Sequence, residues 1–129
     1  MTKVVGIIPA RLGSTRLSAK PLRQIAGKSL ITHVYENALK FGLHDLMVAT
    51  DHESIVEEIE KVGGKALLTP SELPSGTYRC AHLASKIDAD VIINIQGDEP
   101  FLLNDQVTGL INALKNKDFE IEKRAMLKI

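Results

Sequence analysis

The sequence predicts an α/β fold: a Rossmann-like, three-layer arrangement around a parallel sheet. Short apolar runs, such as residues 3–8 and 91–95, alternate with segments whose apolar residues recur at helical spacing. This alternation is typical of βαβ units, which place helices against the faces of a parallel sheet. No repeat and no Pro/Gly-rich linker divides the 129 residues, so we expect one domain over residues 1–129.

Five segments have the composition of β-strands. The fourth is the most continuously apolar and is therefore expected at the centre of the sheet. The last begins a new strand where the sequence stops, which suggests a doubly wound molecule that has been shortened. The predicted strands are residues 3–8, 46–49, 66–68, 91–95 and 124–129.

Helical spacing predicts helices between these strands, at about residues 29–41, 53–61 and 78–87, and another after Asn104. Ser29 is a suitable N-cap for the first helix, and Gly42 is suited to end it. The residues predicted to face inward are Ile55, Val56, Ile59 and Val62 in the second helix, and Val107, Leu110, Ile111 and Leu114 in the last.

Composition excludes several classes of protein. Sixteen basic and sixteen acidic residues cancel, so no overall field favours nucleic acid or an anionic membrane. Cys80 is the only cysteine, which excludes an intramolecular disulfide and suits a reducing compartment. The first apolar run is too short for a signal peptide, so we expect a cytoplasmic protein.

The loop after the first apolar run concentrates anion-binding groups. Backbone amides, arginine forks and a lysine charge are together what a polyphosphate requires. The loop has neither the Walker A spacing nor the three spaced glycines of dinucleotide-binding loops. The alternative is a solvated loop that is basic by chance. The cations are Arg11, Arg16 and Lys20, interleaved with the donor residues Gly13, Ser14 and Thr15.

Four polar segments are expected at one edge of the sheet. In open parallel sheets, ligands bind beyond the carboxyl ends of the strands. The basic loop, residues 50–52, residues 75–77 and residues 96–99 all follow predicted strands. Asp98 would face the basic loop there and could hold Mg²⁺, which takes one or two carboxylates beside phosphate oxygens. An ordinary turn at the strand end is the alternative interpretation of Asp98.

The remaining reactive residues do not indicate a second chemistry. Cys80 lies on an apolar helical stripe and is expected in the core. No serine or cysteine nucleophile with an evident base is present, which disfavours covalent hydrolysis. The histidines have no metal-ligand spacing with one another or with Cys80; they are His33, His44, His52 and His82.

These motifs resemble those of the CMP-sugar synthetases, and most closely the 3-deoxy-manno-octulosonate (KDO) cytidylyltransferases. They recur in the same order across residues 3–103, which is most of the chain. The matching motifs are Pro9-Ala10-Arg11-Leu12-Gly13-Ser14-Thr15-Arg16-Leu17 with Lys20-Pro21-Leu22, Ala49-Thr50-Asp51, Leu73-Pro74-Ser75-Gly76-Thr77 with Arg79, and Asn94-Ile95-Gln96-Gly97-Asp98-Glu99-Pro100-Phe101.

The resemblance implies the fold of the nucleotide-diphospho-sugar transferases and a reaction of lipopolysaccharide synthesis. The anomeric hydroxyl of KDO would attack the α-phosphorus of CTP, and pyrophosphate would leave. Such catalysis depends on positioning and charge neutralisation. By the same resemblance, Arg11, Lys20 and Asp98 are catalytic, and Asp98 binds Mg²⁺. The implied substrate-binding residues are Ala10, Leu12, Ser14, Thr15, Arg16, Ser75, Arg79 and Gln96, with Gln96 facing the sugar acid.

Three departures from the family pattern bear on activity. Ser18 and Tyr78 stand where the family usually has proline and aspartate. Family members are also roughly twice as long, and their second half carries another metal-binding aspartate, most sugar contacts and the surface of a homodimer. We therefore expect this chain to bind CTP weakly and to show little or no turnover.

Two other functions stay open from the sequence. One is activation of a different sugar acid, as in CMP-sialate or CMP-pseudaminate synthetases. The other is a non-catalytic nucleotide-binding fragment that self-associates through its unpaired last strand. Nucleic-acid binding is disfavoured because aromatic residues, at 4%, are few and the net charge is zero.

Overall fold

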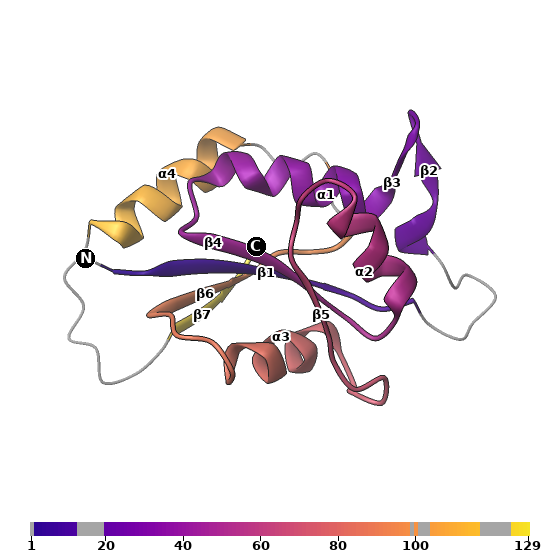
Figure 1. Cartoon of the computed structure of the whole chain (residues 1–129). Helices are drawn as coiled ribbons and strands as arrows, with labels where there is room; N and C mark the ends of the chain where they lie inside the picture. Colours follow the sequence, from indigo (N-terminus) through magenta and orange to yellow (C-terminus); the bar gives the residue numbers. More distant parts are fainter. Residues whose placement is uncertain (1, 13–19, 99, 101–103, 117–124) are drawn as a thin grey trace.

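One parallel sheet forms the centre of the molecule (Figure 1). The structure is a computed structural model, and it describes residues 2–12, 20–98, 100, 104–116 and 125–129. The five strands lie in the order β5-β4-β1-β6-β7, and every neighbouring pair is parallel. They are β1 (Val4–Ala10), β4 (Asp45–Thr50), β5 (Ala66–Leu68), β6 (Val91–Asn94) and β7 (Ala125–Lys128).

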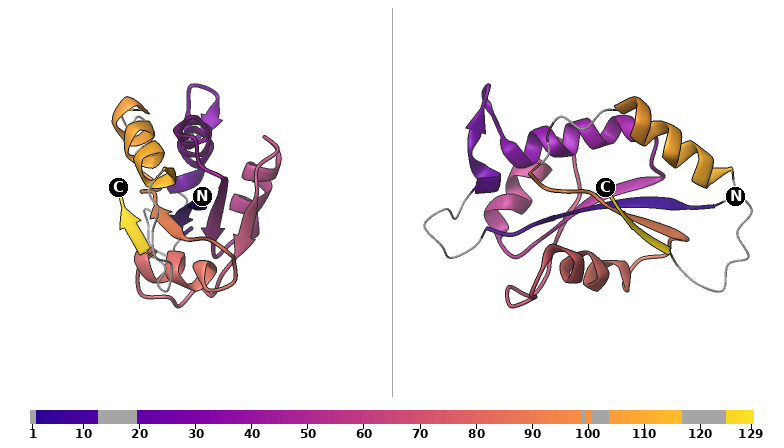
Figure 2. Two further views of the ribbon diagram at one scale, coloured as in Figure 1. Left: turned by 90° about the vertical axis from the view of Figure 1, so that its left-hand side faces the viewer. Right: turned by 180° about the vertical axis from the view of Figure 1, so that it is seen from behind.

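Helices cover both faces of this sheet, which confirms the predicted three layers. One face packs against α1 (Leu30–Ala38), α2 (Glu53–Glu60) and α4 (Asn104–Lys115), and the other packs against α3 (Gly76–Ala84). The end-on view in Figure 2 shows the sheet between these two helical layers. No helix in the described ranges is long and apolar enough to cross a bilayer.

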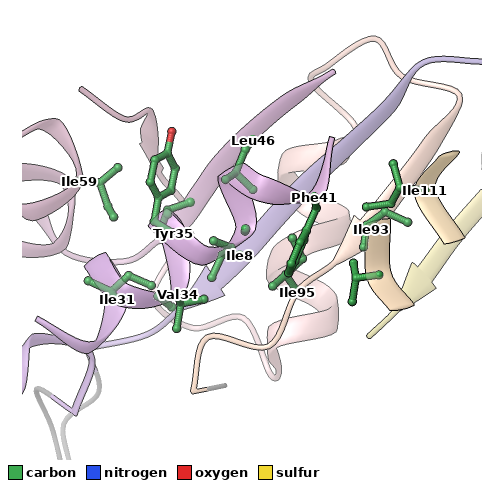
Figure 3. Close-up of a cluster of buried hydrophobic side chains, with 14 of the residues drawn as sticks. Ile8, Ile31, Val34, Tyr35, Phe41, Leu46, Ile59, Ile93, Ile95 and Ile111 are labelled. Atoms are coloured by element: carbon green, nitrogen blue, oxygen red, sulfur yellow. The ribbon is translucent and has the colours of Figure 1, made fainter. Parts of the chain in front are cut away.

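The larger of the two apolar layers lies beneath α1, α2 and α4 (Figure 3). Strand residues alternate between faces, so the even-numbered positions of β1 point into this layer and the odd-numbered Val5 and Ile7 point towards α3. Cys80 is fully buried in the α3 layer, as predicted. The side chains labelled in Figure 3 include Ile8, Ile31, Val34, Tyr35, Phe41, Leu46, Ile59, Ile93, Ile95 and Ile111.

The first helix is capped as the sequence predicts. The Ser29 hydroxyl accepts a hydrogen bond from the Thr32 N–H at 3.3 Å. The helix tightens into a 3-10 turn, Leu39–Phe41, and the chain leaves it at Gly42 with φ +81°. That left-handed conformation favours glycine because no Cβ is present to clash.

Several sequence-based expectations are corrected by the structure. The middle strand is β1, and the more continuously apolar β6 is the inner strand beside it. Val62 and Leu110 are 39% and 41% exposed, so neither is a core residue. Helical spacing predicts which side of a helix faces the core, but not how wide the buried stripe is. The two residues at the margin of the stripe were therefore wrongly predicted to be buried.

A two-stranded hairpin precedes α1 and was not predicted. It pairs β2 (Gln24–Ile25) with β3 (Lys28–Ser29) in antiparallel fashion. Ala26 and Gly27 form the turn with φ of 50° and 83°. Positive φ at both turn residues is the geometry of the tightest hairpins. The strands are only two residues long, which leaves too little alternation for sequence reasoning to detect.

Two elements near the strand ends also differ from prediction. Strand β1 continues through Pro9 to Ala10, beyond the expected end at Ile8. Pro9 lies past the last β1–β6 pair, Ile7 with Asn94, so no ladder to β6 needs its missing N–H. Helix α3 begins at Gly76, two residues earlier than predicted, with Ser75 as its N-cap.

Candidate functional site

A cluster of clefts lies at the carboxyl ends of β1 and β6. The sheet order reverses between these strands, because β4 and β5 extend from one side of β1 and β6 and β7 from the other. Such a switch point leaves a crevice where ligands bind in open α/β sheets. In Figure 1 the carboxyl end of β1 lies on the side of the molecule that carries the β2–β3 hairpin.

The first cleft is lined by two cationic side chains and one carboxylate and has a volume of about 230 Å³. Arg11 and Lys20 supply positive charge, and Asp98 faces them from the turn after β6. The Lys20 ammonium lies 3.8 Å from the Asp98 carboxylate, and both side chains are more than half exposed. An exposed pair of this kind contributes little stability, so both groups are available to a ligand.

Gly97 lets the turn that carries Asp98 approach β1 closely. A Cβ at this position would lie 2.7 Å from the Pro9 carbonyl oxygen. Backbone cannot yield as a flexible side chain can, so the position requires glycine. The close approach is what brings Gln96 and Asp98 to the wall of the same cleft as Ala10 and Arg11.

The second cleft, of about 250 Å³, contains a buried arginine. Arg79 is 1% exposed, and its Nη1 donates to the Thr69 hydroxyl at 2.5 Å and to the Pro70 carbonyl at 2.8 Å. Its Nη2 is buried without a partner among the described residues. Burial lowers the pKa of the Arg79 guanidinium, while the nearby Asp51 carboxylate opposes that shift. A buried donor without a partner is the kind of group that an ordered water or a ligand acceptor satisfies.

Asp51 fixes the start of the basic loop. Its Oδ1 accepts a hydrogen bond from the Leu12 N–H at 2.9 Å, which ties the loop to the end of β4. Its charge also acts on Arg79. Sequence reasoning placed residues 50–52 at this edge without giving Asp51 a role. The role becomes visible only from the short distance between its Oδ1 and the Leu12 nitrogen.

A third and smaller pocket adjoins both clefts. It has a volume of about 130 Å³ and lies between the start of α3, the end of β6 and the end of β7. Asn94 is 2% exposed there, and its Oδ1 has no partner among the described residues. Lys128 lines the same pocket. Neither residue was singled out from the sequence, although a polar Asn94 within an apolar strand was an available signal.

The structure brings most of the predicted site residues together. Arg11 and Ala10 line both large clefts, Lys20, Gln96 and Asp98 line the first, and Ser75 and Arg79 line the second. Leu12 packs against the larger core and contacts Asp51 through its backbone. Their individual roles remain predictions. Ser14, Thr15, Arg16, Ser18 and Glu99 lie outside the described residues.

The residues present fit a hard cation at Asp98. Asp98 is the carboxylate that lines the first cleft among the described residues, and no group of three or more His, Cys, Asp or Glu side chains there could form a protein-only metal site. Mg²⁺ commonly binds through one or two carboxylates together with substrate phosphates. One carboxylate opposite Arg11 and Lys20 suits that mode of binding.

The histidines have structural roles. The Nδ1 of His44 accepts the Val4 N–H at 3.0 Å, and the Nδ1 of His52 accepts the Ser54 N–H at the start of α2. A ring nitrogen of His33 is hydrogen-bonded to the Ile25 carbonyl in the hairpin. These contacts explain the three residues without a metal or a catalytic proton.

Comparison with known proteins places this chain in a family. The model of the family described as Cytidylyltransferase matches residues 5–127. A 3-deoxy-manno-octulosonate cytidylyltransferase of Escherichia coli is 43% identical over 117 residues, covering 90% of this chain and 48% of the relative. The enzyme of that name from Fusobacterium nucleatum subsp. nucleatum is 46% identical over 121 residues, covering 92% of this chain and 49% of the relative.

A solved structure has the same fold. CMP:2-keto-3-deoxy-manno-octonic acid synthetase, solved in complex with CTP, superposes with a TM-score of 0.83 at 42% identity, covering 90% of this chain and 48% of its own. The present chain therefore spans about half the length of the curated relatives it matches. The family match extends over nearly the whole chain, from β1 to β7. The chain belongs to the cytidylyltransferase family.

Proposed function

We propose that this chain provides the nucleotide-binding half of an enzyme that joins CTP to 3-deoxy-manno-octulosonate, giving CMP-KDO and pyrophosphate. The observation that carries the proposal is the position of Arg11 and Ala10, which line both large clefts at the switch point. A nucleotide that spans the two clefts would place its phosphates by Lys20 and its base by Arg79.

The first cleft would hold the triphosphate. Arg11 offers a bidentate guanidinium, and Lys20 a point charge, to oxygens that become more negative as pyrophosphate leaves. Ser14, Thr15 and Arg16 would add donors from the same loop. Groups that are positioned before the reaction stabilise such charge without reorganisation, which is how catalysis of this class works.

The second cleft would hold the cytosine and ribose. The free Nη2 of Arg79 is a donor, and cytosine presents the acceptors O2 and N3. The two bonds from Nη1 to Thr69 and Pro70 fix the plane of the guanidinium, so Nη2 has a defined direction. Ser75 and the backbone of Ala10 and Leu12 would complete this part of the site.

Asp98 would hold Mg²⁺ against the phosphates in place of its ion pair with Lys20. When bound, the cation would supply positive charge to the phosphate oxygens. In the reaction itself, the anomeric hydroxyl oxygen of the sugar acid forms the new bond to the α-phosphorus, and its proton is released to water. The bond from that phosphorus to the bridging oxygen breaks, and pyrophosphate departs. Gln96, on the wall of the first cleft, would face the sugar acid.

Calorimetric titration with CTP and Mg²⁺ tests the nucleotide half of the proposal. We expect binding by the wild-type chain and about tenfold weaker binding by R79K, because lysine lacks the fork that contacts Thr69 and the ligand together. R23K is a matched control, since Arg23 is exposed and lines none of the three pockets. Equal affinity for CTP, GTP and ATP, or no binding at all, would contradict the proposal.

The homodimer and the cytoplasmic location expected from the sequence remain predictions. A different sugar acid, such as sialate or pseudaminate, remains the alternative acceptor. Competition among these acids in the presence of CTP would decide between them.

A further inference from the structure

Thr69 is a buried polar residue beside the guanidinium of Arg79. It directly follows β5 and is 8% exposed. Its backbone N–H and its hydroxyl both donate to the carbonyl of Thr50, at 2.7 Å and 3.0 Å. Two hydrogen bonds to the same acceptor leave the side chain one rotamer, so the end of β4 determines where the hydroxyl oxygen of Thr69 lies.

The chemistry of the groups gives the hydrogen bonds of this hydroxyl one direction. A threonine hydroxyl has one proton and two lone pairs, whereas a guanidinium can only donate. Because the proton of Thr69 is used on the Thr50 carbonyl, a lone pair faces Arg79, whose Nη1 lies 2.5 Å from the hydroxyl oxygen. Thr69 is therefore a fixed acceptor for the guanidinium of Arg79.

The Nη1 of Arg79 is used entirely on the protein. Its two N–H groups have two acceptors, the Thr69 hydroxyl and the Pro70 carbonyl at 2.8 Å. Because a guanidinium is planar and rigid, these contacts also orient Nη2, which is buried and has no partner among the described residues. Of Arg79 and Thr69, only Arg79 lines the second cleft. Any effect of Thr69 on a ligand must therefore pass through Arg79.

We propose that Thr69 is a positioning residue for recognition of the base: it holds the Arg79 guanidinium so that Nη2 presents its N–H groups to the acceptor edge of a pyrimidine. This inference rests on the proposed function, which assigns cytosine to the second cleft. Without the Thr69 hydroxyl, Nη1 would keep only the Pro70 carbonyl, and the plane of the guanidinium would no longer be fixed. The loss would fall on binding of the base and spare the phosphates, which the first cleft would hold.

Calorimetric titration with CTP and with inorganic tripolyphosphate, each in the presence of Mg²⁺, tests the inference. T69V keeps the branched shape and removes the hydroxyl, and we expect it to bind CTP about tenfold more weakly. Its binding of tripolyphosphate, which has no base, should be unchanged. T69S keeps the hydroxyl and should retain most of the affinity for CTP. T32V is the matched control, because Thr32 is 5% exposed, its hydroxyl is hydrogen-bonded to that of Ser29, and it lines neither nucleotide cleft.

A double-mutant cycle with R79M shows whether Thr69 acts through Arg79. R79M removes every guanidinium donor, so T69V should cause almost no further loss of CTP affinity in that background. Losses that add would mean that Thr69 acts by another route. Thermal melts establish that the variants are folded before their affinities are compared. If T69V does not fold, T69S and T69A take its place, because these two variants differ only in the hydroxyl.

The outcomes distinguish this inference from the proposed function. If wild type binds CTP and T69V binds it equally tightly, Thr69 has no positioning role and the nucleotide proposal stands. Equal weakening of CTP and tripolyphosphate by T69V, or additive losses in the cycle with R79M, also overturns the role of Thr69 alone. Failure of wild type to bind CTP overturns the proposed function, and the role of Thr69 with it.

Discussion

At the scale of single residues, Asp51 offers a sharp test of how the basic loop is held. Its Oδ1 accepts the Leu12 N–H at 2.9 Å, so Asp51 ties the start of the basic loop to the end of β4. D51A removes the acceptor and should weaken CTP binding by about tenfold. This is the change in affinity expected from the loss of one hydrogen bond to a charged group. D51N keeps an acceptor oxygen and should lose less affinity. Calorimetry on both variants measures the difference, and equal losses would show that the hydrogen bond is not the cause.

Cys80 provides a test based on pH. Burial raises the pKa of its thiol to about 12, from an ordinary value of 9.0. Above pH 9 the unfolded chain loses this proton and the folded chain keeps it, so the free energy of unfolding should fall by about 1.4 kcal/mol for each pH unit until the folded thiol also ionises. Urea unfolding between pH 8 and pH 10 measures the slope. The slope should be shallower in C80A, and an identical slope would exclude the thiol as its source.

At the scale of elements, the turn after β6 depends on Gly97. A Cβ there would lie 2.7 Å from the Pro9 carbonyl oxygen, so G97A must push the turn away from β1. Backbone shifts of this kind cost about 1–3 kcal/mol, and the shift would also move Asp98 and Gln96 from the cleft wall. We expect lower stability together with weaker CTP binding.

Gly109 gives the matched control for that substitution. It lies within α4, where an added Cβ meets nothing within 4 Å. G109A should therefore stabilise the chain by about 0.5–1 kcal/mol, because alanine favours helix over glycine. Chemical denaturation and CTP titration of both variants provide the comparison. A stable G97A variant with unchanged CTP affinity would contradict the expected role of the close approach.

The sequence predicts an element well when neighbouring residues determine it, and poorly when contacts distant in the sequence determine it. The period of apolar residues and the Ser29 cap are local features, and they predicted the five strands and the first helix. The β2–β3 hairpin is too short to show a period, and its turn depends on the φ of Ala26, which composition does not reveal. Local signals therefore give the layers of the fold and miss its smallest elements.

The site follows the same rule. Arg11, Lys20 and Asp98 could be proposed because strand ends meet at one edge, and Arg79 because its motif resembles that of a known family. Asp51 and Lys128 required a distance and a strand register, which are long-range properties of the folded sheet. Asn94 was detectable in principle, since an amide in the buried run of β6 needs a partner.

At the scale of the whole molecule, the chain spans about half the length of the relatives it matches, yet it contains the switch point and all three pockets described above. In the proposed function, the groups that bind the nucleotide all lie around the switch point. In-line transfer also needs the acceptor held within reach and water excluded, and each of these lowers the activation barrier by several kcal/mol. We therefore expect this chain to bind CTP while releasing pyrophosphate slowly or not at all.

A coupled assay for pyrophosphate, with CTP, Mg²⁺ and 3-deoxy-manno-octulosonate, measures that difference directly. CTP should raise the melting temperature of the chain, because a ligand that binds the folded state stabilises it by an amount that grows with its concentration. R79K should show a smaller increase at the same CTP concentration. A shift in melting temperature without turnover is the expected result. A robust rate of pyrophosphate release from the 129-residue chain would show instead that the groups around the switch point suffice for the transfer.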